Sequence, residues 1–166
     1  MSLFDCSQSD ELIAECVLKR ARWTGLAKLP IDAAAVAESL GIRTVRDDSI
    51  APLGVRRMQE NGTAALVYCA ARSKPDTRFA VAHALGHILL EQRYVPCDET
   101  VEHLSFDHAD PKERRANQFA LRLLMPRADV MSLGSRHGKL CAEQMARVFA
   151  VTPRAACLRI DQMAWL

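Results

Sequence analysis

The stretch Ala80–Gln92, AVAHALGHILLEQ, is the most informative segment of the chain. His83 and His87 are four residues apart, and residues at this spacing lie one above the other on the same face of a helix. Their neighbours are small or apolar, so we expect a buried helix whose two imidazole rings point into one enclosed space. Gly86 would let a second backbone pass close to His87. A neutral, metal-binding imidazole is tolerated in such a space, whereas a charged one is costly.

A second segment, Glu113–Pro126, reads ERRANQFALRLLMP and predicts an amphipathic helix. Glu113 and Asn117 extend its apolar stripe by one turn, so we expect both to face the interior. A buried carboxylate needs a partner, because desolvating it alone is expensive. Zinc held by the two histidines would supply that partner, with Asn117 orienting a ligand. Taken alone, the first segment is better explained by hydrogen-bonded core histidines, and the second by a surface ion pair of Glu113. The two segments together favour a metal site.

The rest of the pattern predicts an α+β domain that is mostly helical and has one small β-sheet. Asn61 and Gly62 predict a tight hairpin between strands over 54–60 and 63–69. Asp32 is a candidate N-cap and Gly41 a candidate stop of a short helix. The segment 94–111 is expected to be a loop. Helices are expected over 10–26, 32–41, from about 77 through the histidines, 111–126, about 141–149 and 152–166.

Length and composition indicate one soluble globular domain. The chain has 166 residues, of which 49% are hydrophobic and 25% charged. We divide it into N-terminal helices over 1–48, a core over 49–126 and C-terminal helices over 127–166. A formal net charge of +2 gives no sign of a nucleic-acid or membrane partner.

Location and cysteine usage also follow from the composition. The opening residues lack a basic start and an apolar run, and no segment reaches the roughly 20 apolar residues of a membrane span, so a cytoplasmic protein is expected. The six cysteines include no CxxC pair and are expected to be small buried hydrophobes.

The two motifs together resemble the ImmA/IrrE family of zinc metallopeptidases. The family pattern reads approximately RFTxAHExGHxLLH, followed after a variable loop by ExxANxFAxxLLMP. This chain has RFAVAHALGHILL at Arg78–Leu90 and the second motif at Glu113–Pro126. The resemblance extends from about Ala21 to the closing helices. It implies a mostly helical zincin-like metallopeptidase domain with a small sheet and a C-terminal helical segment.

The resemblance also implies a ligand set for Zn²⁺. His83 and His87 would be the first two ligands and Glu113 the third, with Asn117 outside the ligand set. A third histidine six residues after His87 is ruled out, because Arg93 stands there. Histidines 103 and 108 are expected to be solvated loop residues. Two histidines and a glutamate suit zinc better than manganese.

Ala84 occupies the position where an HExxH peptidase has its general-base glutamate. Alanine cannot transfer a proton, and general acid-base help is worth about a hundred- to ten-thousand-fold in rate. We therefore expect zinc binding to survive while peptidase activity is absent or severely impaired. An engineered Glu to Ala substitution is favoured, because every other element of the site is present; a natural pseudopeptidase that only binds its target is the alternative.

The resemblance implies cleavage of a DNA-binding transcriptional repressor or an antitoxin-type regulator. We expect the edge of the strand Thr63–Cys69, through Leu66, Val67 and Tyr68, to pair with an extended segment of this substrate. A different possibility is a helix-turn-helix DNA-binding module over AEQMARVFAVTPRAACLRI, with Arg154 and Arg159 on its second helix. Few basic residues and many packing residues in that segment argue against direct nucleic-acid binding.

Overall fold

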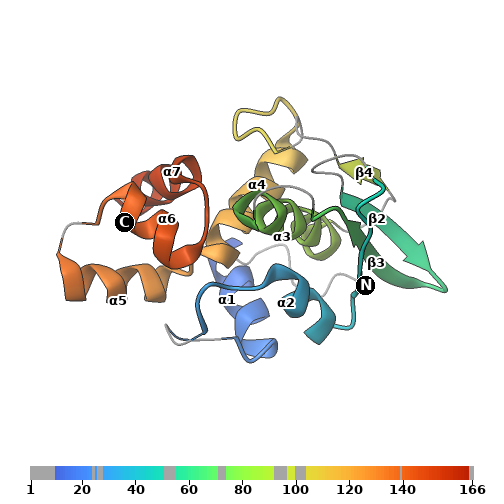
Figure 1. Ribbon diagram of the computed structural model, residues 1–166, viewed down its shortest axis with the longest axis horizontal. Coiled ribbons are helices and arrows are strands. Elements are labelled where there is room, and N and C mark those ends of the chain that lie inside the picture. The colour runs from blue at the N-terminus through green and yellow to red at the C-terminus, as the bar shows by residue number, and fades with distance from the viewer. Residues whose placement is uncertain are drawn as a thin grey trace.

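The computed structural model describes residues 10–23, 25, 28–50, 55–70, 74–91, 97–99, 104–138 and 140–164. Over these residues the chain forms seven helices and four strands. Figure 1 shows the sheet at one end of the molecule, the C-terminal helices at the other, and the remaining helices between them. This arrangement confirms the predicted mostly helical α+β fold.

The four strands form one mixed sheet in the order β1-β3-β2-β4. β2 (Val55–Glu60) and β3 (Thr63–Tyr68) make the predicted antiparallel hairpin. Its turn residues Asn61 and Gly62 have φ angles of 50° and 78°, the left-handed conformation that a tight two-residue turn needs. β1 (Arg43–Arg46) and β4 (Cys97–Glu99) were not predicted; β1 pairs parallel with β3, and β4 pairs antiparallel with β2.

This strand order contradicts the expected free edge of β3. β3 lies inside the sheet and is hydrogen-bonded to β1 on one side and to β2 on the other. Leu66 is fully buried, while Val67 and Tyr68 are partly exposed. A substrate segment therefore cannot add to this strand, because both rows of its main-chain groups are already paired. Among the described strands, the outer positions belong to β1 and β4.

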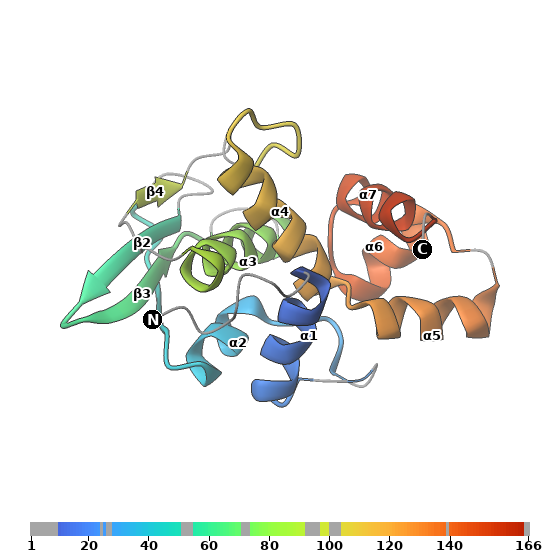
Figure 2. The same ribbon diagram turned by 180° about the vertical axis from the view of Figure 1, so that it is seen from behind.

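Two long helices form the centre of the molecule. α3 (Lys74–Leu90) lies between the sheet and α4 (Pro111–Leu124), as both views show (Figures 1 and 2). A methyl group at Gly86 would lie 3.1 Å from Cδ1 of Phe119 and 3.3 Å from the Cα atom of Ala116. The predicted close approach beside His87 is thus confirmed, and the neighbouring backbone is that of α4.

Local capping signals explain where several helices begin. Asp32 accepts hydrogen bonds from the backbone of Ala34 and Ala35 at the start of α2 (Ala33–Ser39), as predicted. Asp110 caps α4, and Thr152 accepts a hydrogen bond from Ala155 N in α7 (Pro153–Ala164). α3 begins at Lys74, before the predicted caps. α1 (Asp10–Arg20) is shorter than predicted.

The C-terminal helices lie together beyond α4, away from the sheet (Figures 1 and 2). α5 (Arg127–His137) was not predicted, whereas α6 (Ala142–Phe149) and α7 match the expectation. Arg159 on α7 is only 1% exposed. Its guanidinium donates to the backbone oxygen of Met125 at the end of α4 and forms a salt bridge with Glu11 on α1. Arg159 is thus unavailable to DNA, which weakens the helix-turn-helix alternative further.

Two composition-based expectations have different outcomes. Cys69 is buried as expected, but Cys16, Cys141 and Cys157 are exposed free thiols, so the general expectation of buried cysteines was wrong. Small residues such as cysteine lie on the solvent-facing side of a helix as readily as on its core-facing side. The spacing of the cysteines in the sequence did not distinguish exposed positions from buried ones. None of the helices in the described part of the chain is long and apolar enough to cross a membrane.

Candidate metal centre

α3 and α4 bring His83, His87 and Glu113 together, as the sequence predicted. The Nε2 atoms of the two histidines are 3.1 Å apart. Oε2 of Glu113 lies 3.1 Å from Nε2 of His83 and 3.2 Å from Nε2 of His87. The histidines are 0% and 2% exposed and Glu113 is 9% exposed. The three atoms therefore form a nearly equilateral triangle in a protected space.

Asn117 fixes the orientation of the first histidine. Its side-chain amide donates to the backbone oxygen of Ser105 over 2.9 Å. Its Oδ1 atom, 2.8 Å from Nδ1 of His83, is therefore the acceptor in that contact. Nδ1 of His83 must carry the proton, and Nε2 presents its lone pair to the triangle. This contact agrees with the predicted role of Asn117 in orienting a ligand.

Glu91 fixes the second histidine in the same way, a role that the sequence analysis missed. Its carboxylate accepts a hydrogen bond from Nδ1 of His87, one helical turn earlier. Arg57 on β2, only 5% exposed, places Nη1 3.8 Å from the same carboxylate oxygen. The spacing of four residues between His87 and Glu91 was the available signal.

The residues fit a metal ion by their chemistry as well as their spacing. With both Nδ1 atoms donating to other groups, the triangle consists of two imidazole lone pairs and a carboxylate oxygen, which are all acceptors. Such atoms repel one another unless a cation or extra protons lie between them. Three ligands of a tetrahedral zinc with bonds of about 2.0–2.1 Å are roughly 3.3 Å apart. The observed separations of 3.1–3.2 Å are close to that value.

Electrostatics keep Glu113 ionised. When no metal is bound, protonated rings take the place of the cation: burial alone would raise the pKa of the Glu113 carboxyl group, but the hydrogen bonds and positive charges of protonated His83 and His87 outweigh this effect and lower the pKa to about 2. A carboxylate, rather than a carboxylic acid, therefore faces the two rings at neutral pH. This is the protonation state that a metal ligand requires.

Ala84 follows His83 on α3 and is fully buried. Position 84 therefore supplies no carboxylate to the triangle. Glu91 contacts His87 on the ring atom opposite the triangle, so it cannot replace a base that acts inside it. His108 accepts a hydrogen bond from the backbone of Asp110 and is not part of the triangle, whereas His103 lies outside the described residues.

Comparison with known proteins identifies the family. A model described as the IrrE N-terminal-like domain of a peptidase family matches residues 37–161. The chain belongs to the IrrE N-terminal-like family. The match confirms the resemblance found in the sequence, and it covers α3 and α4 as well as the C-terminal helices through most of α7.

A solved structure described as a Mycobacterium tuberculosis transcriptional regulator shares the fold of this IrrE N-terminal-like chain. The TM-score is 0.59 and the sequence identity is 18%, over 90% of this chain and 45% of the regulator. This chain thus spans less than half of the regulator's length, and the likeness concerns the fold alone. A comparison with curated proteins found no significant match.

Proposed function

We propose that this chain is a zinc-dependent endopeptidase of the ImmA/IrrE type in a form that binds its protein substrate without cleaving it efficiently. The observation that supports the proposal most directly is the triangle of His83, His87 and Glu113 beside Ala84. Family membership supports a peptidase ancestry. The hydrogen bonds from the rings to Asn117 and Glu91 support a site that still holds its metal.

His83, His87 and Glu113 would hold the zinc ion. Zinc bound there would polarise the scissile carbonyl and acidify the attacking water. Asn117 and Glu91 would keep the two rings aligned, since each occupies the Nδ1 atom that faces away from the metal. Burial of both rings would exclude bulk water and strengthen these interactions. The chain's own residues thus provide binding and orientation.

Proton transfer is the step for which this site lacks a group. The base must accept a proton from water and deliver it to the departing amine. Ala84 has no titratable group, Glu113 is a ligand, and Glu91 is held on the far side of His87. We propose that cleavage is slowed by about a hundred- to ten-thousand-fold for this reason. Fold and metal affinity would be unaffected.

We favour an engineered replacement of glutamate by Ala84 over a natural pseudopeptidase. Both ligand histidines, Glu113 and the two groups that orient the rings are all present. A protein that had lost the chemistry would have no chemical need for the complete set. The residue encoded at position 84 in the unmodified gene distinguishes the two origins.

For the substrate, we propose a DNA-binding repressor or an antitoxin-type regulator. The support is the family, together with the fold shared with a transcriptional regulator. The substrate segment would run along an outer strand of the described sheet, β1 or β4. It would not run along β3, because β1 and β2 already pair with that strand. We also propose a cytoplasmic location, as expected for a protein that acts on such regulators.

Restoring the carboxylate tests this proposal. Ala84→Glu and the matched control Ala84→Gln should be compared in the full chain. The first variant regains a base, and the second has nearly the same size but cannot accept the proton. Zinc content should be measured for all three proteins, and cleavage of a proteome-derived peptide library should be followed by mass spectrometry, with thermal unfolding to verify folding.

We expect about one zinc per chain in every protein and cleavage by Ala84→Glu alone. Zinc in all three with no cleavage by folded Ala84→Glu would favour the pseudopeptidase. Absence of zinc would contradict the metal site itself. Equal cleavage by Ala84→Gln would show that the chemistry does not depend on a carboxylate at position 84.

A further inference from the structure

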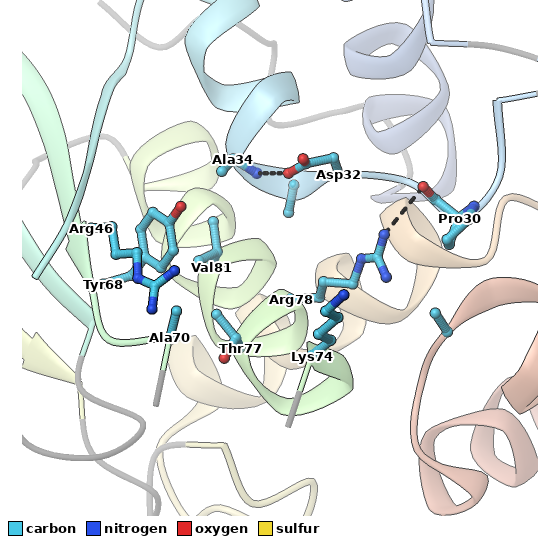
Figure 3. Close-up of a pocket in the computed structure, with 12 residues that line it drawn as sticks. Pro30, Asp32, Ala34, Arg46, Tyr68, Ala70, Lys74, Thr77, Arg78 and Val81 are labelled. Atoms are coloured by element: carbon cyan, nitrogen blue, oxygen red, sulfur yellow. Dashed lines mark hydrogen bonds between the residues drawn. The ribbon is translucent and has the colours of Figure 1, made fainter. Parts of the chain in front are cut away.

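A cavity of about 670 Å³ lies beside the first half of α3 (Figure 3). It is formed where the first half of α3 faces the start of α2 and the ends of β1 and β3. Its volume is in the range of small-molecule sites. The lining residues, none of which is a proposed metal ligand, are Pro30, Asp32, Ala33, Ala34, Arg46, Tyr68, Ala70, Lys74, Thr77, Arg78, Val81 and Ala150.

The cavity carries an excess of positive charge. Three cations, Arg46, Lys74 and Arg78, line it against one carboxylate, that of Asp32, among the described residues. Oδ1 of Asp32 is already used to cap α2. Arg46 forms a two-point salt bridge with Asp48, which is not a lining residue. The charges of Lys74 and Arg78 are therefore the ones available to a ligand.

Lys74 and Arg78 carry like charges that repel each other. They are four residues apart on α3 and point into the same space (Figure 3). Like charges at this spacing repel and destabilise a helix. Within the described part of the chain, neither side chain forms a salt bridge with a carboxylate. An anion between them would remove the repulsion.

Two backbone carbonyl groups hold Arg78 in place. Its Nε atom donates to the backbone oxygen of Ile31 over 3.0 Å, and Nη2 donates to that of Pro30 over 3.3 Å. Burial lowers the pKa of Arg78, because the guanidinium has lost part of its hydration, and the negative charge of Asp32 offsets only part of this shift. The two carbonyl groups fix the orientation of the cation without neutralising it. This is the arrangement expected of a preorganised anion-binding arginine.

We infer that this cavity binds a small organic anion. Its carboxylate or phosphate group would pair with Lys74 and Arg78. Its apolar part would lie against the remaining wall, which includes Ala33, Ala34 and Val81. The apolar wall is the reason to expect an organic molecule rather than an inorganic ion. The inference does not depend on the metal site or on peptidase activity.

The test is a titration of the full chain with three probes of similar size. Phenyl phosphate and benzoate carry the two candidate anionic groups, and benzyl alcohol is their neutral counterpart. Binding is followed by calorimetry at constant ionic strength. Lys74→Gln removes a cation from the cavity, and Lys19→Gln removes an exposed cation from α1 as a matched control. Thermal unfolding verifies that both variants fold.

We expect saturable binding of at least one anionic probe and not of benzyl alcohol. Lys74→Gln should weaken this binding about tenfold, the loss expected for one charge-assisted contact, and Lys19→Gln should leave it unchanged. The tighter of the two anionic probes identifies the preferred headgroup. The inference is overturned if neither anion saturates, if the alcohol binds equally well, or if the two lysine variants behave alike.

Discussion

Glu91 lies one helical turn after His87, and its carboxylate accepts a hydrogen bond from Nδ1 of that ring while Arg57 lies 3.8 Å from the same oxygen. A strand, a helix end and a proposed metal ligand are thereby connected. The contact gives His87 a fixed tautomer and a more basic Nε2 atom. Removing it should weaken metal binding without removing a ligand.

Glu91→Ala should lower zinc affinity about 10- to 100-fold, the usual effect of losing a hydrogen-bond partner of a ligand histidine. Competition with a chromophoric chelator measures this. Glu143→Gln, an exposed carboxylate on α6, is the control and should retain full affinity. An unchanged affinity in Glu91→Ala would show that His87 is oriented by packing alone.

Two substitutions of Asn117 should separate its effect on the metal from its effect on stability. Asn117→Asp keeps an acceptor for His83 but loses the donor to Ser105, so it should retain zinc and lose about 1–3 kcal/mol of stability. Asn117→Ala loses the acceptor as well as the donor, so it should lose both zinc affinity and stability. Zinc competition and chemical unfolding are the measurements, and equal zinc affinities in the two variants would contradict the assignment.

Gly86→Ala should destabilise the protein even though alanine is the better helix former by about 1 kcal/mol. The new methyl group would lie 3.3 Å from the Cα and O atoms of Ala116, which belong to a packed helix backbone and cannot yield easily. We expect a net loss of about 1–3 kcal/mol in the free energy of unfolding.

Gly134→Ala on α5 is the matched control for that substitution. Its new methyl group would make only an ordinary contact, 3.7 Å from Cδ1 of Leu140. It should therefore stabilise the chain by about 0.5–1 kcal/mol. Urea unfolding compares the two variants, and stabilisation by both would mean that α3 and α4 can move apart freely.

Metal removal should lower the melting temperature. Zinc at 100 times its dissociation constant stabilises a protein that binds it only when folded by about 2.7 kcal/mol. His83→Ala should abolish this dependence on zinc. His108→Ala, which alters a histidine outside the triangle, should preserve it. A zinc-dependent shift that persists in His83→Ala would place the metal elsewhere.

The sequence was sufficient for the parts of the fold that depend on local signals. Spacing of four residues placed His83 and His87 on one face, an apolar stripe extended to Glu113, and Asn61 with Gly62 defined the hairpin. The position of β3 inside the sheet was not predictable in this way. Its parallel partner β1 is a strand of four residues about twenty positions earlier, and no turn signal specifies such a distant pairing.

The orientation of the proposed metal ligands was predictable only in part. Asn117 lies on the apolar face of an obvious amphipathic helix, so its inward direction followed from the pattern. Glu91 follows the last turn of α3, where a charged residue is ordinarily solvent-exposed. Its contact with His87 depends on Arg57, which the sheet brings from a separate segment.

The salt bridge between Glu11 and Arg159 connects the first described helix to the last. Arg159 also bonds to Met125, at the end of the helix that carries Glu113. Detaching either α1 or α7 would leave a cation or an anion without its partner and would loosen the anchor of α4. The two extremities of the described chain and Glu113 between them should therefore unfold as a single cooperative unit.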